Sequence, residues 1–254
     1  MTSVVRPFLF AWHFLTAVPL SRRHHEPTAI ELASSMAWYS TIGLLIGGTL
    51  VLADAVLITL FDSEVVNALL IVLLVILTRG LHQDGLADTL DGLAGGRTPG
   101  ERLPIMRDPS IGAMGATSLF LSLLLRYAGL MALPQVLRVP ALLCMPALGR
   151  WAMVMVAWLS PYARSEGGLA APFLSHLSIL HVLAANVVLL AALVVSFGPF
   201  GTLAVLAIGS VAVFTAWAGC RSWFGGITGD TLGATNELTE VLFLLFLPLI
   251  LFLR

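Results

Sequence analysis

Three carboxylates share one face of a predicted helix near the middle of the chain. Asp84, Asp88 and Asp91 follow the spacing i, i+4 and i+7 within the run GLHQDGLADTLDG, residues 80–92. At about 100° per residue, they project within roughly 60° of one another. Like charges this close repel, and a divalent cation that prefers oxygen ligands, Mg²⁺ or Mn²⁺, removes the repulsion. The spacing therefore predicts a metal site.

The alternative interpretation of this run is a solvated, acidic end of a helix. Carboxylates favour the N-terminus of a helix, where the macrodipole is positive. These three follow a long apolar stretch, however, and we expect them at the C-terminal end of a membrane span, Val65–Gln83. A carboxylate is unfavourable there without a cation, which favours the metal site.

A second acidic run, residues 225–240, combines glycines with further carboxylates. Asp230 and Glu237 are again seven residues apart, and Glu240 follows three residues later. Glycine-rich backbone before a helix can hold phosphate through its N–H groups. The alternative is a capped helix start with Thr228 or Asp230 as the cap, which explains Asp230 well and Glu240 poorly.

Between the two runs lies a loop, residues 97–112, that carries arginines. Arg102 and Arg107 offer planar guanidinium groups that match phosphate oxygens. Alone, such a loop is typical of the positively charged connections that set membrane topology. Beside carboxylates it favours a Mg²⁺–diphosphate substrate and phosphoryl-type chemistry.

The elements that must position these residues are membrane helices. The chain has 254 residues, of which 58% are hydrophobic and 11% charged, whereas soluble domains have about 25% charged residues. Its mean hydropathy is +0.96. This excludes a soluble globular enzyme, a disordered chain and a disulfide scaffold. The net charge of −1 argues against a basic surface for nucleic acid.

The apolar segments predict an all-α integral membrane protein, a polytopic bundle of about seven transmembrane helices in a single domain, residues 1–254. Residues 6–20 predict an additional N-terminal helix that is interfacial or half-inserted. Glycine and proline at 196–201 predict a tight hairpin between two spans. The expected spans are Trp38–Leu60, Val65–Gln83, Ile111–Leu133, Pro140–Pro161, Leu177–Ser196, Pro199–Cys220 and Glu237–Leu253.

Arginine placement predicts the orientation. With these spans, Arg22, Arg23 and the loop 92–110 lie on one side, which the positive-inside rule makes cytoplasmic. Both acidic runs fall on that side. Arg126 and Arg150 fall inside expected spans and therefore need acidic partners or a polar cavity.

Several runs resemble signatures of the cobalamin synthase family. The run 80–92 is similar to the family's main signature, and IMRDPSIG (105–112) and GGITGDTLGA (225–234) resemble two others. FLTAVP (14–19) and IGLLIG (42–47) are similar to its N-terminal pieces, although Ala17 stands where a basic residue is common. The matches keep the expected order and cover nearly the whole chain.

The resemblance implies a Mg²⁺-dependent transferase, with Mn²⁺ as a substitute, in the inner membrane and with its active site facing the cytoplasm. It would join adenosylcobinamide-GDP to α-ribazole or its 5′-phosphate, giving adenosylcobalamin or its 5′-phosphate and releasing GMP. The catalytic residues would be Asp84, Asp88 and Asp91. These three would bind metal together with Asp230, Glu237 and Glu240, and substrate would contact His82, Arg102, Arg107, Asp108, Arg164, Thr228 and Asn236.

Two other functions compete with this one. CDP-alcohol phosphotransferases of phospholipid synthesis also follow Asp-Gly with further carboxylates, but have Ala-Arg where this chain has Ala87-Asp88. An ion-coupled transporter would place its polar breaks near the bilayer midplane, whereas both acidic runs here are expected at one face. The expected partners are the two substrates and the lipid bilayer, not nucleic acid. The sequence leaves the oligomeric state open, a homo-oligomer included.

Overall fold

The structure is a computed structural model that describes residues 2–21, 26–168 and 170–249. Over this part of the chain the fold is helical and holds no strand beyond one isolated bridge, between Tyr162 and Ile227. Arg22, Arg23 and the last residues of the final expected span lie outside it. The elements are α1 (Thr2–Leu15), α2 (Ala29–Ser35), η1 (Met36–Trp38), α3 (Tyr39–Leu57), α4 (Ser63–Thr78), α5 (Leu81–Gly95), α6 (Pro99–Ile105), α7 (Ala113–Met131), α8 (Gln135–Leu159), α9 (Ala171–Ser175), α10 (Ile179–Gly219), η2 (Cys220–Phe224) and α11 (Gly229–Phe246).

The predicted polytopic helical membrane fold is confirmed. Among the described residues, five helical segments are long and apolar enough to cross a bilayer, and α4 with α5 forms a sixth if this bent pair is one span. The five segments are Ala29–Leu57, Ala113–Met131, Gln135–Leu159, Ile179–Phe224 and Gly229–Leu249.

The longest of these segments, α10, folds back on itself. Gly198 has φ 68° and ψ 178°, a conformation that interrupts the helix at the predicted hairpin. Before the break, Asn186 and Ser196 contact Trp151 and Cys144, so this arm runs antiparallel to α8. After it, Gly209 packs on Trp151, and Trp217 donates to the carbonyl of Leu159, so the second arm runs parallel to α8. The two arms of this segment correspond to the two expected spans Leu177–Ser196 and Pro199–Cys220.

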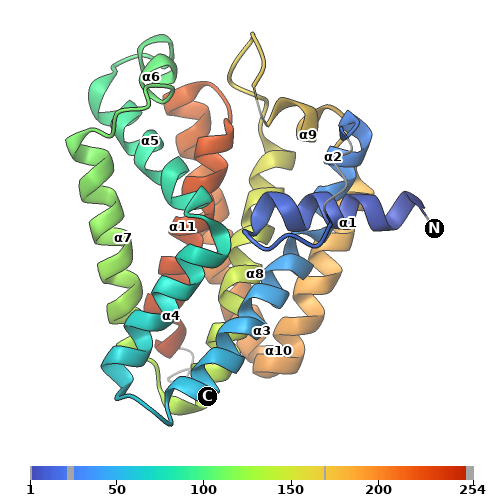
Figure 1. Ribbon diagram of the computed structural model, residues 1–254. Coiled ribbons are helices and arrows are strands. Elements are labelled where there is room, and N and C mark those ends of the chain that lie inside the picture. Colours follow the sequence, from blue (N-terminus) through green and yellow to red (C-terminus); the bar gives the residue numbers. More distant parts are fainter. Residues whose placement is uncertain (1, 22–25, 169, 250–254) are drawn as a thin grey trace.

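Helix α8 forms the centre of the bundle and packs against α3, α10 and α11 (Figure 1). Its contact with α3 depends on small residues, as is common between membrane helices. A Cβ atom on Gly43 would lie 2.6 Å from the carbonyl oxygen of Pro146. The bare backbone of α3 therefore lies directly against α8.

The expected span Val65–Gln83 is interrupted, which corrects the sequence interpretation. Arg79 and Gly80 are both left-handed, with φ of 54° and 65°, and the axes of α4 and α5 differ in direction by 89°. Asp84 consequently lies in the first turn of a new helix, α5, where the macrodipole favours a carboxylate. The expectation that the three carboxylates end the membrane span Val65–Gln83 is therefore wrong, because all three lie within α5.

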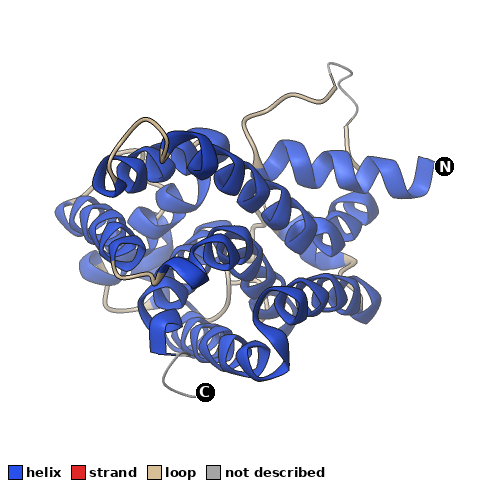
Figure 2. Cartoon of the chain, turned by 90° about the horizontal axis from the view of Figure 1, so that it is seen from below, coloured by secondary structure: helices blue, strands red, loops and turns tan. Residues whose placement is uncertain are grey.

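Helix α1 runs across the bundle rather than along it, as both views show (Figures 1 and 2). Its 14 residues span about 21 Å, too short to cross about 30 Å of hydrocarbon. Arg79 donates to the His13 carbonyl at 2.9 Å, and the Ala17 N–H donates to the Leu77 carbonyl at 2.7 Å. This placement agrees with the expected interfacial helix.

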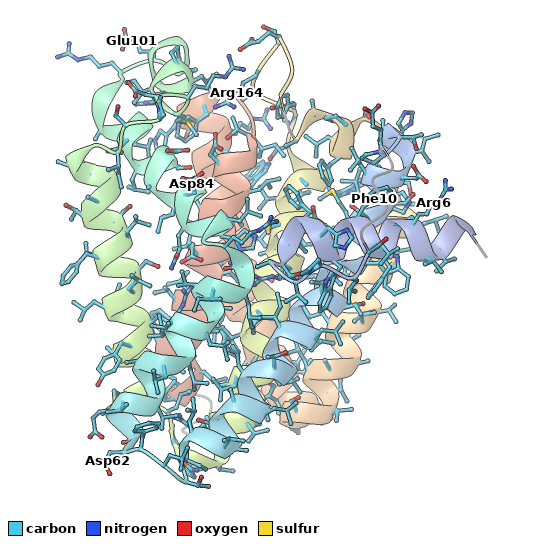
Figure 3. All side chains as sticks on the ribbon, in the orientation of Figure 1. Arg6, Phe10, Asp62, Asp84, Glu101 and Arg164 are labelled. Atoms are coloured by element: carbon cyan, nitrogen blue, oxygen red, sulfur yellow. The ribbon has the colours of Figure 1, made fainter. Side chains whose placement is uncertain are left out.

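The loop after α5 and the segment before α11 lie at one end of the bundle, called here the polar end. Arg102 of α6 donates to the carbonyl of Trp223 in η2 at 2.8 Å, which joins these two segments. Figure 3 shows Glu101 and Arg164 at this end and Asp62 at the other.

Candidate active site

Helices α5 and α11 cross in direct backbone contact at two glycines. A Cβ on Gly85 would lie 2.6 Å from the carbonyl oxygen of Asp230, and one on Gly233 would lie 3.1 Å from that of His82. Because neither residue has a side chain, the two helices approach closely enough to bring Asp84 and Asp230 to the same cavity lining. Asp84 of the first acidic run and Asp230 of the second therefore lie together at this crossing.

Asp84 and Asp88 also line a larger cavity of about 550 Å³ between α5 and residues 109–119. The charge of Asp88 interacts with those of Asp84, Asp91 and Asp230, and Arg164 is the cation that opposes them. Asp84, Asp88 and Arg79 are the charged residues that line the cavity, so its wall carries excess negative charge.

Arg164 pairs with Asp230 at the crossing of α5 and α11. One Nη of its guanidinium donates to Asp230 at 3.0 Å, and its side chain is 10% exposed. Within the described part of the chain its Nε has no hydrogen-bond partner. Residues 161–163 are held against the start of α11 by two backbone hydrogen bonds of 2.9 Å with Ile227. These bonds fix Arg164 beside Asp230.

Asp91 faces the start of α7. Its two oxygens accept from the backbone N–H groups of Gly112 and Gly115, each at 2.7 Å. The carboxylate thus caps a helix N-terminus that has no cap of its own. A carboxylate offers about four lone-pair sites, so these two bonds leave capacity for a further ligand.

Glu237 and Glu240 do not join the other carboxylates, and the expected single acidic wall is corrected. Arg126 donates to Glu237 at 3.0 Å and to Glu240 at 2.9 Å, and Arg150 donates to Glu240 at 2.6 Å. All four side chains are buried. The predicted need of Arg126 and Arg150 for acidic partners is confirmed, and the two guanidinium groups already neutralise both carboxylates.

Four of the predicted substrate-binding residues are engaged within the protein. Asn236 donates to Glu240 at 3.1 Å in the buried cluster, and Thr228 caps α11 by accepting from the N–H of Thr231. Arg102 donates to two carbonyl oxygens, those of Gly96 and Trp223. Asp108 accepts from the N–H of Ser110 at 2.9 Å, and this bond lowers the pKa of its exposed carboxyl.

Arg107 lies at the surface of the polar end. Its guanidinium pairs with Glu166 at 2.9 Å, and both side chains are about half exposed, at 46% and 59%. The pair connects the loop before α7 to the loop after α8. Arg107 is not among the residues that line the two cavities at Asp84, whereas Arg164 lines the one that Asp84 shares with Asp230.

Asp84 and Asp88 are the two carboxylates that line the larger cavity. Among the described residues, no group of three or more His, Cys, Asp or Glu side chains is arranged to hold a metal ion. Mg²⁺ is commonly held by one or two carboxylates together with substrate phosphates and water. The pair Asp84 and Asp88 on an open cavity is a donor set of this kind.

Sequence reasoning missed an aromatic cavity on the other side of Asp84. It has a volume of about 180 Å³, and Phe14, Tyr39, Tyr162 and Phe173 contribute to its walls. In the sequence these residues resemble ordinary packing residues of apolar or loop segments. No local pattern indicated that four separate elements would bring them together.

Comparison with known proteins identifies the family. The family model of cobalamin-5-phosphate synthase matches residues 7–248. An adenosylcobinamide-GDP ribazoletransferase of Syntrophobacter fumaroxidans is 42% identical over 218 residues, covering 85% of this chain and 87% of the relative. Proteins of the same name from Chlorobaculum tepidum and Desulfitobacterium hafniense are 37% and 35% identical, covering 89% and 95% of this chain and 88% and 96% of the relatives. No solved structure matches the chain significantly. With a match that includes both α5 and α11, the chain belongs to the cobalamin-5-phosphate synthase family.

Proposed function

We propose that the chain transfers the corrinoid phosphate of adenosylcobinamide-GDP to α-ribazole or to its 5′-phosphate. A ribose hydroxyl oxygen forms a bond to the cobinamide-bound phosphorus, and the bond from that phosphorus to the bridging oxygen breaks. GMP leaves with the bridging oxygen, and the hydroxyl proton passes to a carboxylate. The observation that carries the proposal is the meeting of Asp84 and Asp230 at the α5–α11 crossing.

The residues of this chain supply positioning and charge. Asp84 and Asp88 face the larger cavity, where a diphosphate would lie, and Asp91 lies one turn further along α5. Arg79 lines this cavity with Asp84 and Asp88, and its guanidinium can donate to a phosphate oxygen, whereas Arg164 pairs with Asp230 in the wall of the smaller cavity. Phosphoryl transfer depends mainly on such positioning and on charge neutralisation.

The same residues support a requirement for Mg²⁺, with Mn²⁺ as a substitute. Asp84 and Asp88 would hold the cation, with Asp91 and Asp230 close by. The bound ion would neutralise charge on the diphosphate and on departing GMP. Glu237 and Glu240 are not part of this proposed set, because Arg126 and Arg150 already bind them.

We place the protein in the cytoplasmic (inner) membrane with this site facing the cytoplasm. The arginine-bearing loops support this orientation, since Arg97, Arg102 and Arg107 all follow α5 at the polar end of the bundle. The nucleotide product GMP would then be released into the compartment that recycles nucleotides.

The test is turnover in membranes that contain the chain. Adenosylcobinamide-GDP, α-ribazole and Mg²⁺ are supplied, and GMP is measured. We expect GMP release that stops when the cation is chelated and returns with Mg²⁺ or Mn²⁺. Asp84→Asn should reduce the rate by at least about a hundredfold.

The matched control is Asp62→Asn, the same change at the opposite end of the bundle. Asp62 makes no side-chain cap of α4, so this variant should retain the wild-type rate. Membrane insertion of both variants is compared by immunoblotting. Normal GMP release by inserted Asp84→Asn would refute the proposed site.

A further inference from the structure

The two cavities beside Asp84 differ in a way that suits two different substrates. The smaller one, called here the aromatic chamber, lies between α5, α8, α11 and the N-terminal elements, with a volume of about 180 Å³. The larger one, the open cavity, has a volume of about 550 Å³ and lies along α5 toward α7. Asp84 lines both. A reaction with one small and one very large substrate requires such a shared boundary.

The aromatic chamber has the size and walls for one flat ring system. The rings of Phe14 and Phe173 contact each other with centroids 5.0 Å apart and planes inclined by 42°, and Tyr39 is buried beside them. Aromatic walls favour a planar aromatic guest through stacked and edge-on contacts. A protein cavity of about 150 Å³ can hold a benzene ring, whereas pockets for drug-sized ligands measure about 300–1,000 Å³. A corrin macrocycle is excluded from this volume.

Two of the residues that line the chamber, His82 and Tyr162, carry buried polar atoms without partners in the part of the chain that the structure describes. Among the described residues, His82 Nε2 and the Tyr162 hydroxyl are buried and make no hydrogen bond. His82 as a whole is only 3% exposed. A buried polar group that lacks a partner costs free energy, so a ligand that pairs with it is favoured.

Both atoms can donate a hydrogen bond. The guanidinium of Arg150 lies 3.5 Å from His82 Nδ1, and because a guanidinium can only donate, this contact assigns the ring proton to Nε2. Burial raises the pKa of the Tyr162 phenol, which keeps its proton at neutral pH. A small rotation that turns either group toward the chamber would offer a donor to a guest that carries acceptors, as an aza-aromatic base and its ribose do.

The open cavity has the opposite character. Its wall combines Asp84 and Asp88 with Arg79, and its apolar side is formed by residues such as Ile111, which is 58% exposed. It can admit a bulky group that remains partly in solvent, together with a cation and a diphosphate.

We propose that the aromatic chamber binds the heterocyclic base of α-ribazole, and that the open cavity binds the corrinoid diphosphate. This inference rests on the proposed function and adds to it an assignment of each substrate to its own cavity. The ribose hydroxyl would emerge from the chamber beside Asp84 and Asp230 and meet the phosphorus there. α-Ribazole and its 5′-phosphate share the base, so both enter the same chamber.

The experiment is a crossed kinetic comparison in membranes. Phe173→Ala and Tyr162→Phe alter the chamber, and Ile111→Ala alters the open cavity. We expect both chamber variants to raise KM for α-ribazole. Phe173→Ala, which removes an aromatic wall, should raise it by about tenfold, and Tyr162→Phe, which removes a hydroxyl, by a smaller factor. KM for adenosylcobinamide-GDP should stay within about twofold. Ile111→Ala should show the reverse pattern.

A second readout does not depend on turnover. Binding of α-ribazole alone to the purified protein is measured by calorimetry, and Phe173→Ala should weaken it by a factor similar to the rise in KM. Tyr162→Phe removes a single unpaired hydroxyl, so it keeps the test valid if Phe173→Ala does not fold. If the wild-type protein releases no GMP, the proposed function fails. If it turns over but the chamber variants change neither KM nor binding of α-ribazole, the assignment of the chamber fails.

Discussion

At the scale of single residues, buried charge in this molecule is neutralised in pairs and clusters. Arg138 contacts Asp54 at 2.6 Å near the end opposite the candidate site, and Arg126 and Arg150 contact Glu237 and Glu240 within the bundle. Removing charges from water is expensive, and hydrogen-bonded partners offset that cost. The cluster therefore holds α7, α8 and α11 together rather than supplying ligands to the site.

The first prediction at this scale concerns Glu240, which lies between the two arginines. Glu240→Gln removes one carboxylate and leaves Arg126 and Arg150 to share Glu237. An uncompensated buried charge typically costs about 3–5 kcal/mol. We expect a loss of this size in the free energy of unfolding, measured by denaturation of the purified protein in detergent.

The control for this prediction is Glu64→Gln in the first turn of α4. Glu64 is exposed and its change should cost less than about 1 kcal/mol. Equal stability of the two variants would mean that the buried cluster does not stabilise the fold.

The sequence indicated half of this arrangement. An arginine in an apolar span must find an acidic partner, so the need of Arg126 and Arg150 was predictable. The identity of the acidic partners was not predictable, because the spacing of Glu237 and Glu240 suits a metal ion as well as a guanidinium. Only the packing of α7 and α8 against α11 shows that the two glutamates bind guanidinium groups rather than a metal ion.

At the scale of elements, the site depends on the break between α4 and α5 and on the crossing of α5 with α11. The apolar pattern predicted a single helix through residues 65–83, because Arg79 and Gly80 interrupt it by only two positions. The hydrophobic pattern does not reveal that Arg79 and Gly80 adopt left-handed backbone conformations, or that the chain turns by 89° there. The hairpin at Gly198 was predictable, since Pro199 and Gly201 mark it in the sequence.

The prediction at this scale concerns the glycine contact. Gly85→Ala places a methyl group against the backbone of Asp230, which cannot move as a flexible side chain would. The helices must separate, and a displacement of about 1 Å between reacting groups can cost roughly a hundredfold in rate. We expect a rate loss of that order in inserted protein, measured by GMP release.

Gly48→Ala in α3 provides the matched control. A Cβ at Gly48 meets nothing within 4 Å, so the variant should keep its activity. Replacing a helical glycine should also raise stability by about 0.5–1 kcal/mol. Full activity of Gly85→Ala would show that the close crossing of α5 and α11 is not needed for the reaction.

At the scale of the whole molecule, the proposed site lies toward one end of a lipid-facing bundle. The polar end carries α6, the end of α5 and the start of α11, and the opposite end carries the short turn at Asp62 (Figures 1 and 3). The difference between the two ends was predictable from the sequence, because it follows from the number of apolar segments and the positions of the arginines. The aromatic chamber was not predictable, since its walls come from segments as distant in sequence as Phe14 and Phe173.

The last prediction concerns sidedness. Single cysteines are introduced at Thr98 and Ser222, both exposed at the polar end, and at Asp62, exposed at the other end. The background replaces the two buried native cysteines, Cys144 and Cys220, with alanine. A membrane-impermeant maleimide is applied to right-side-out and to inside-out vesicles. Positions at one end of the bundle must react from the same side, and those at opposite ends from opposite sides.

We expect Thr98→Cys and Ser222→Cys to react only in inside-out vesicles and Asp62→Cys only in right-side-out vesicles. The physical reason is that arginine-bearing loops are retained in the cytoplasm during insertion. Reaction of the first two from opposite sides would contradict the shared end of α6 and α11, and the candidate site would be lost with it. Reaction of both from the outside would leave the fold intact but would move the proposed site, with its release of GMP, away from the cytoplasm.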